Sequence, residues 1–271
     1  MKRSDGFPGL TGRSLKLLLC RLCEAAHRDV SRFPQHEAVA VHQLRLRMKK
    51  IHALLRMAEH AVKEQTLHAM RQHIRSVKNA CAVSRGNAVR DELIDKLAHR
   101  FHLPITRLPH PVTKACDHPS TAFIRHQLLA LEQLVKMADI EHLGEEEILV
   151  LHTRCYRRGR RLLKQIAETA DEPSLHRWRH RVKDLYFQTL VLHHLPGARK
   201  RIRRSHRLGS LLGRDHDLAE LAQEPAFRSR RGPWPELIRE RREQLRKRFL
   251  ALAFKLYSPA CSRFNQRVLP H

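Results

Sequence analysis

Apolar positions recur with the spacing of an α-helix along nearly the whole chain. Leu, Arg, Ala, His, Lys and Glu dominate, and alternation of apolar and polar positions around β-branched residues is scarce. Proline and glycine mark where the periodic segments end. The pattern therefore predicts an all-α fold, with helices over about residues 14–33, 36–60, 64–83, 120–138, 145–170, 173–195, 199–212, 215–223 and 235–257 and a shorter helix after Asn87.

The order of these segments repeats once along the chain. A long helix, a proline-containing turn and a second long helix come before residue 140, and the same order returns from residue 145. Residues 101–120 hold four prolines and are predicted to form a loop. We predict one domain over residues 14–257, with halves over 14–140 and 145–257, a basic tail over 1–13 and a C-terminal tail over 258–271.

A ten-residue pattern occurs twice, 134 positions apart. The first copy runs from His42 to Ile51 as HQLRLRMKKI, and the second runs from His176 to Leu185 as HRWRHRVKDL. In both copies an arginine follows the histidine by three residues and a lysine follows it by seven. Such internal similarity predicts that the two halves use equivalent helices in equivalent places.

Cations share one face of each repeated helix. At about 100° per residue, one sector of the first helix holds His42, Arg45, Lys49, His52 and Arg56. The matching sector of the second helix holds His176, Arg179 and Lys183, and no acid falls within either sector. Like charges four residues apart destabilise a helix. A solvated basic face is the simplest alternative, but its recurrence in both halves favours a site for an external anion.

The overall charge points in the same direction. The 271 residues include 53 Lys and Arg against 27 Asp and Glu, which gives a formal charge of +26 before any of the 21 histidines is protonated. The composition excludes disordered, collagen-like and disulfide-scaffold classes, and no stretch has the length and apolarity of a membrane span. Three anionic partners fit this charge: nucleic acid, a membrane surface and a condensed phosphate polymer.

The two copies resemble the signatures of the CHAD domain family, which is named for its conserved histidines and α-helical fold. The first copy is similar to the family pattern H-x-x-R-x-x-x-[RK]-[RK]-[LI], and the second to H-x-x-R-x-x-x-K-x-L-x-[YF], with Phe187 at the aromatic position. The run Tyr156-Arg157-Arg158 and the segment from Gly213 to Leu218 resemble two further family motifs. The resemblance covers about residues 14–257.

The resemblance implies an all-α fold of two pseudo-symmetric antiparallel helical bundles around a central basic groove or pore. It also implies binding of inorganic polyphosphate and association with polyphosphate granules and their proteins. We expect the two His-led helices to face each other and line one cationic channel. Neighbouring helices are expected to add further cations to it, namely Arg21, Arg28, Arg75, Arg157, Arg160 and Arg207.

The chain departs from the family pattern in two places. The first-half turn usually reads R-D-x-D-V, whereas residues 85–89 read RGNAV and lack both acids. His52 and Tyr186 stand where the family usually has arginine. The E-x-E-x-K strand of fused triphosphate tunnel domains is not found, so the resemblance is to a stand-alone protein of the family.

Nucleic-acid binding is the main alternative function, because net charge alone supports it equally well. Aromatic side chains for base stacking are few, and Tyr186 alone lies in the basic sectors. Binding to a membrane surface predicts aromatic residues beside Lys and Arg on one helix, for which the segment with Phe249 and Phe254 is the candidate. A core role for that segment is the simpler interpretation.

An enzyme of phosphoryl transfer would need a nucleotide loop or metal-binding carboxylates. The sequence has neither, and the pair Asp215 and Asp217 is interpreted as having a capping or helix-pairing role, so no catalytic activity and no cofactor are predicted. Cys20, Cys23 and His27 are spaced for one helix face, but no second cysteine pair completes a zinc site. With no export signal in evidence, reduced thiols and a cytoplasmic location are expected.

Overall fold

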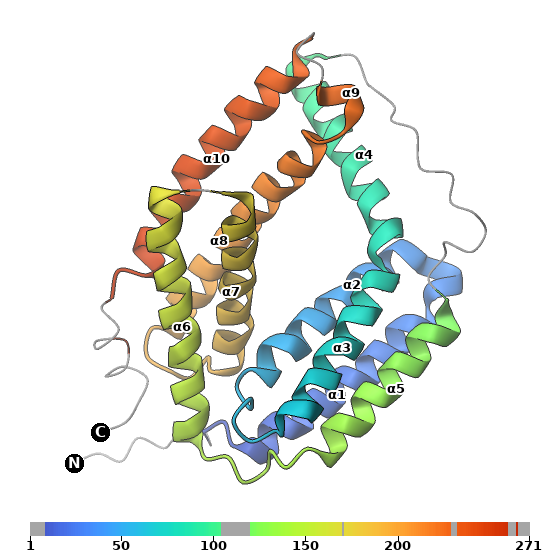
Figure 1. Cartoon of the computed structure of the whole chain (residues 1–271), viewed down its shortest axis with the longest axis vertical. Coiled ribbons are helices and arrows are strands. Elements are labelled where there is room, and N and C mark those ends of the chain that lie inside the picture. The colour runs from blue at the N-terminus through green and yellow to red at the C-terminus, as the bar shows by residue number, and fades with distance from the viewer. Residues whose placement is uncertain (1–8, 104–119, 170, 229–231, 260–263, 265–271) are drawn as a thin grey trace.

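The computed structural model describes residues 9–103, 120–169, 171–228, 232–259 and 264, and in this part helices joined by turns and loops are present without a strand (Figure 1). The predicted loop over 101–120 lies almost wholly outside these residues. The helices are α1 (Gly12–Ser31), α2 (Phe33–Leu55), α3 (Glu64–Ala80), α4 (Ala82–Phe101), α5 (Thr121–Met137), α6 (Glu145–Glu168), α7 (Glu172–Val191), α8 (Ala198–Leu221), α9 (Pro225–Arg228) and α10 (Trp234–Leu256).

Capping residues explain where several helices begin. Thr11 and Ser14 form a reciprocal capping box at the start of α1. The carboxylate of Glu147 accepts a hydrogen bond of 2.9 Å from the backbone N–H of Gly144 at the start of α6. The carboxylate of Asp171 accepts one of 2.8 Å from the backbone N–H of Ser174 at the start of α7. Each bond satisfies a polar group that the first turn of a helix leaves without a partner.

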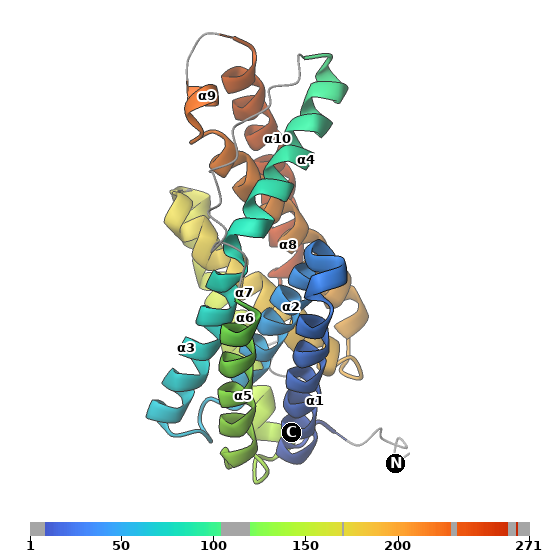
Figure 2. The ribbon, with the colours of Figure 1, turned by 90° about the vertical axis from the view of Figure 1, so that its right-hand side faces the viewer.

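The helices pack as two groups that meet along α2 and α7. Helices α1, α2, α3 and α5 contact one another in the first half, and α6, α7, α8 and α10 do so in the second. The two His-led helices, α2 and α7, pack directly against each other between the groups. Helix α4 contacts α2, α3 and α8 and so connects the halves a second time (Figure 1, Figure 2).

The apolar stripe of each His-led helix lies in the continuous core. Leu44, Met48 and Ile51 of α2 are fully buried, as are Trp178 and Val182 of α7. The cationic sector of each helix therefore flanks a buried stripe, as the wheel predicted. The large buried area anchors both helices through the hydrophobic effect, which fixes the side from which their cations emerge.

Two of the predicted helix breaks are wrong. Helix α8 is continuous from Ala198 to Leu221, although a break was expected near Gly213. Gly209 and Gly213 lie one turn apart on the face toward α7, and a Cβ at Gly213 would stand 3.5 Å from an Nη atom of Arg179. A Cβ at either position would make only ordinary van der Waals contacts, and the glycines do not end α8. Likewise, α4 runs through residues 85–89, because the chain turns earlier, at Cys81.

The core extends beyond the predicted C-terminal boundary at residue 257. Phe264 is 1% exposed, and its ring stacks on that of Tyr156 at a centroid distance of 3.9 Å. The Tyr156 hydroxyl also donates a hydrogen bond of 2.9 Å to the carbonyl oxygen of Pro259. The segment that follows α10 is therefore tied to α6 by packing and by a hydrogen bond, at least at these positions.

Candidate functional site

Two adjoining cavities lie beside the α2–α7 contact. The first, named here the α4/α8 cavity, has a volume of about 620 Å³, and its polar walls come from α2, α3, α4, α7 and α8. Its charged and histidine side chains are Arg45, Lys49, Lys78, Arg90, His176, Arg179, His180, Lys183, His216, Asp217, Glu220 and Glu224.

The second, named here the α3/α6 cavity, has a volume of about 640 Å³ and is walled by α2, α3, α6 and α7. Its charged and histidine side chains are Lys49, His52, Arg56, Arg71, Arg75, Lys78, Arg158, Arg161, Arg177, His180, Arg181, Lys183 and Asp184. The two cavities share Lys49, Lys78, His180 and Lys183, so they adjoin at the α2–α7 contact.

Eight of the predicted site residues line these cavities. Arg45 and Lys49 of α2 share the α4/α8 cavity with His176, Arg179 and Lys183 of α7. The α3/α6 cavity receives three more predicted cations, His52, Arg56 and Arg75. The cationic sectors of the two His-led helices therefore converge on a common space and do not point away from each other.

Six predicted residues do not line either cavity: His42, Arg21, Arg28, Arg157, Arg160 and Arg207. Arg21 and Arg28 are exposed on α1, whose packing against α2 and α5 keeps it away from the cavities. His42 is exposed one turn before the α2 cations reach the cavity. On α6, Arg158 and Arg161 take the place predicted for Arg157 and Arg160, since they lie one residue, or about 100°, further round the helix.

Several lining cations were missed. Arg71 and Lys78 form one stripe of α3 with the predicted Arg75, at the i, i+4, i+7 spacing of a helix face, which the sequence already contained. His180 lies one turn after His176 and lines both cavities. Tyr186, the one aromatic residue of the predicted sectors, lines neither cavity, and its ring lies 5.2 Å from that of His206.

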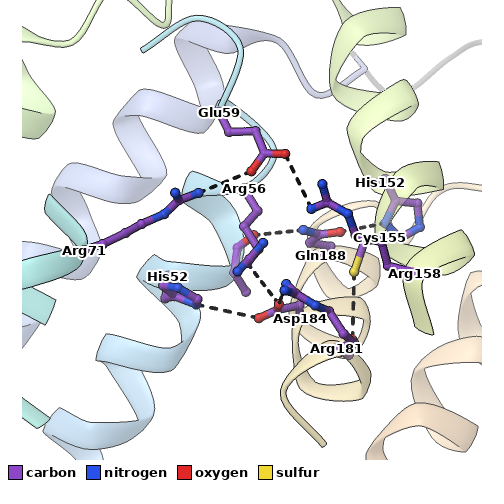
Figure 3. A network of polar contacts seen from close by, with 11 residues as sticks. His52, Arg56, Glu59, Arg71, His152, Cys155, Arg158, Arg181, Asp184 and Gln188 are labelled. Atoms are coloured by element: carbon purple, nitrogen blue, oxygen red, sulfur yellow. Dashed lines mark hydrogen bonds and ion pairs between the residues drawn. The ribbon is translucent and has the colours of Figure 1, made fainter. Parts of the chain in front are cut away.

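A buried carboxylate from α7 neutralises part of the α2 strip. Asp184 is buried, and its Oδ2 atom lies 3.1 Å from Nε of Arg56 and 3.3 Å from Nη1 of Arg181. The His52 ring lies 3.9 Å from its Oδ1 atom (Figure 3). Burial opposes ionisation of Asp184, but His52, Arg56 and Arg181 together lower the pKa of this carboxyl. Within the repeat, Asp184 corresponds to Lys50 of the first copy.

A second carboxylate holds the cations at the edge of the same cavity. Glu59, which follows α2, lies 3.3 Å from Nη2 of Arg71 on α3. Its other oxygen lies 3.6 Å from Nη1 of Arg154 and 3.8 Å from Nη1 of Arg158, both on α6. Glu59 therefore connects three helices and orients arginine side chains that line the α3/α6 cavity (Figure 3).

A buried amide joins the halves beneath the cations. The Nε2 atom of Gln188 on α7 donates a hydrogen bond of 2.9 Å to the carbonyl oxygen of Ala53 on α2. Its Oε1 atom lies 3.2 Å from Nδ1 of His152 on α6. Burial, aided by the nearby Arg201, lowers the pKa of His152 to about 3, so this ring is neutral. The contact between α2 and α7 is thus fixed by a hydrogen bond as well as by packing.

Two of the cavity histidines, His176 and His180, have lowered pKa values in the absence of a ligand. Burial and the charge of His176 lower the pKa of His180 to about 3. Burial, followed by His216 and Arg179, also lowers the pKa of His176. The Nε2 atoms of His176 and His180 lie 2.9 Å apart, which requires that at least one ring be unprotonated there. Protonation of this pair is therefore unfavourable unless an anion binds close by.

Cation crowding is visible at Lys78. Burial, together with Arg45 and Arg75, lowers the pKa of this ammonium group. Burial likewise lowers the pKa of Arg56, even though Asp184 opposes the effect. Positive charges are therefore held close together at a cost that an added anion would relieve.

The metal-site alternative finds no geometric support. The Nε2 atom of His27 lies 3.1 Å from Oε2 of Glu132, and burial raises the pKa of the Cys23 thiol to about 12. Within the described ranges, no three potential ligands are close enough to hold an ion. Cys20, Cys23, Cys81 and Cys155 are free thiols. Among the described helices, none combines the length and apolarity required to cross a membrane.

The fold and the cavities define an all-α protein with a cationic site between two groups of helices. The model of the CHAD domain family matches residues 24–226. The chain belongs to the CHAD domain family.

The crystal structure of the CHAD domain from the plant Ricinus communis has a similar fold. It superposes with a TM-score of 0.57 at 15% sequence identity, and the alignment covers 93% of each chain. At this identity the likeness concerns the fold alone. No curated protein sequence matches the chain.

Proposed function

We propose that this protein binds inorganic polyphosphate, a linear polyanion, along the two adjoining cavities. One observation carries the proposal: cations from α2 and α7, one helix from each half, line a common space. Lys49 and Lys183 border both cavities, and arginines from α3 and α6 extend the α3/α6 cavity. Arginine offers two-pronged hydrogen bonds to phosphate, and lysine offers a compact point charge.

The lining favours a polymer without bases over a nucleic acid. Apart from charged and polar groups, the described walls contain only small or aliphatic residues: Ala82, Leu93 and Leu221 in one cavity, and Ile74 and Leu162 in the other. Single-stranded nucleic acids are held largely by stacking of bases on aromatic rings. A polyphosphate chain has no bases to stack, so the Lys and Arg side chains of these walls are sufficient to bind it.

The decisive variant removes the cations of both His-led helices: Arg45→Ala, Lys49→Ala, Arg179→Ala and Lys183→Ala in one protein. We expect the affinity for long-chain polyphosphate to fall by at least about a hundredfold, because four charge-assisted contacts are lost. In the wild type, affinity should fall steeply with salt, since a condensed polyanion releases counterions on binding. Calorimetric titration at several salt concentrations measures both.

The matched control loses the same four charges from exposed sites outside the cavities: Arg13→Ala, Arg125→Ala, Lys200→Ala and Lys247→Ala. This variant should keep most of its affinity. Equal losses in the two quadruple variants would show that only net charge attracts the polymer. Competition with RNA and DNA of matched charge tests the nucleic-acid alternative. If the protein is a nucleic-acid binder, RNA or DNA should displace polyphosphate at equal charge concentration.

We further propose that the protein acts as a binder, without catalysis, and that it associates with polyphosphate granules in the cytoplasm. Incubation with polyphosphate and Mg²⁺ is expected to release no phosphate above the level seen with the quadruple cavity variant. A fluorescent fusion of the wild type should co-localise with granules, and the same fusion of the cavity variant should not. Phosphate release or diffuse wild-type fluorescence would contradict the respective proposal.

A further inference from the structure

Arginines of both halves also converge at the far end of α4. The Cζ atom of Arg100, in the last turn of α4, lies 5.7 Å from the ring centroid of Phe101. The Cζ atom of Arg241, on α10, lies 5.9 Å from the same centroid. In both ribbon views this end of α4 lies near the beginning of α10 (Figure 1, Figure 2). Two guanidinium groups from different halves therefore share one aromatic ring.

Two further arginines lie close by. Burial, followed by the charges of Arg100, Arg248 on α10 and Arg214 on α8, lowers the pKa of Arg241. These neighbours are all cations, and the Nη1 atom of Arg241 donates a hydrogen bond of 2.7 Å to a neutral acceptor, Oε1 of Gln244. Arg100, Arg214 and Arg248 are exposed. The four residues Arg100, Arg214, Arg241 and Arg248 are named here the arginine cluster.

Neighbouring arginines on the same helix show a different arrangement. Arg239 forms ion pairs with Glu236 and Glu243, the latter at 2.9 Å. The Nε atom of Arg242 lies 3.1 Å from Oδ1 of Asp215. The arginines on either side of position 241 are therefore paired with carboxylates of α10 or α8, while the charged groups that most affect Arg241 itself are positive. Mutual repulsion of this kind is relieved when an anion binds.

The arginine cluster lies on the side of α4 that borders the cavity. Arg90 lines the α4/α8 cavity, and Phe101 follows it by eleven residues. Eleven residues make three helical turns within about 20°, so both side chains leave the same face of α4. The rise of about 1.5 Å per residue places them about 16 Å apart along the helix. A linear ligand that leaves the cavity along α4 would reach the arginine cluster directly.

We propose that the arginine cluster is a second anion-binding site, which binds a distal part of the same polyphosphate chain that occupies the α4/α8 cavity. This inference rests on the proposed function and extends it. Simultaneous contact at two sites makes the second binding event intramolecular, so affinity increases once the polymer is long enough to span both. The arginine cluster thereby makes the protein selective for chain length.

The test compares Arg100→Gln/Arg241→Gln with a control that removes one cation from each of the same two helices, Lys96→Gln/Arg239→Gln. Lys96 and Arg239 are exposed and paired with carboxylates. The probes are long-chain polyphosphate and tripolyphosphate, which is too short to span the two sites. For the long polymer, the dissociation constant of the cluster variant should rise about tenfold, and that of the control less than about twofold. Tripolyphosphate should bind all three proteins equally.

Each other outcome overturns the proposal. Equal losses of affinity in the two double variants would mean that net charge alone causes the effect. Unchanged binding of the long polymer by the cluster variant would exclude contact at the arginine cluster. Weaker tripolyphosphate binding in the cluster variant alone would mean that the cavity itself is disturbed. A lower Tm of the unliganded cluster variant would indicate a structural role. If the wild type binds neither probe, the proposed function fails as well. If the wild type binds both probes normally, a negative result for the cluster variant overturns only the proposal of a second site.

Discussion

The two cavities share their central residues but differ in the balance of charge on their outer walls. Among the residues that the structure describes, ten Lys and Arg residues and one carboxylate line the α3/α6 cavity. Six Lys and Arg residues and three carboxylates line the α4/α8 cavity, with three histidines among them. The comparison teaches that two cavities of similar volume beside the same pair of helices can differ in chemistry. The α3/α6 cavity attracts an anion strongly, whereas the α4/α8 cavity attracts it more weakly and in a way that depends on protonation.

The single carboxylate of the α3/α6 cavity should have the largest effect on stability. Asp184→Ala leaves Arg56 and Arg181 without their buried partner, and we expect a loss of about 3–5 kcal/mol in the free energy of unfolding. Denaturant unfolding of the unliganded protein measures it. Because the pKa of Asp184 is lowered in the folded state, its contribution is present above the pKa of the unfolded chain and is lost as the pH falls through the lowered folded value.

The control for this variant is Glu92→Ala, which breaks an exposed ion pair with Lys96 within α4. Exposed pairs of this kind contribute little, so the control should change the free energy of unfolding by less than about 0.5 kcal/mol. A similar small value for Asp184→Ala would mean that Arg56 and Arg181 find water or other partners, and that the buried network does not order this cavity.

The second prediction compares one arginine from the outer wall of each cavity. Arg75 has no ion pair with a described carboxylate, whereas Nη1 of Arg90 lies 3.2 Å from Oε1 of Glu224. Arg75→Gln should weaken long-chain polyphosphate binding about tenfold and lower the salt slope by about 0.7, since one contact is lost. Arg90→Gln should weaken binding about twofold. Salt-series titration measures both, and the reverse order would refute the difference drawn between the cavities.

The smallest expected effect concerns the histidines of the α4/α8 cavity. His176 and His180 have lowered pKa values in the free protein and are neutral at pH 7. A bound polyanion favours the protonated ring and raises these pKa values, so binding takes up protons and strengthens as the pH falls. We expect an increase in affinity of about threefold between pH 8 and pH 6, which corresponds to less than about 1 kcal/mol.

His176→Gln/His180→Gln should remove most of this pH dependence and leave the affinity at pH 8 unchanged. The remaining titratable groups of this wall are His216, Glu220, Asp217 and Glu224, and they stay in the variant. The control His142→Gln removes an exposed histidine outside both cavities and should keep the wild-type profile. A double variant with the full wild-type pH profile would assign the effect to His216 or to the carboxylates.

Helical periodicity predicted the all-α fold and the side of α2 and α7 from which their cations emerge, because both depend on one local rule. An apolar stripe must be buried, so the position of adjacent cations follows from the sequence of one helix. Helix α6 shows where this reasoning ends. Basic residues flank its buried stripe on both sides, and only the packing of Tyr156 and Gly159 against the second half decides that Arg158 and Arg161, and not their neighbours, border the cavity.

Two further differences have the same origin in packing. Helix α8 runs through Gly213 and packs against both α7 and α10, so tertiary packing outweighs the low helix propensity of the glycine. Asp184 lies outside the cationic sector of its own helix, so the sequence of α7 alone gives it no role in the site. It neutralises Arg56 of the opposite helix, so its effect became visible only when both halves were placed together.

The hydrogen bond from Gln188 to the backbone of Ala53 has a kinetic consequence. Parting α2 from α7 would leave an amide and a carbonyl group without partners in a dry interior, at a cost that discourages such opening. The spacing between the halves is therefore set before any ligand arrives. We expect association to proceed without a slow conformational step, at a rate governed by electrostatic attraction and so by ionic strength.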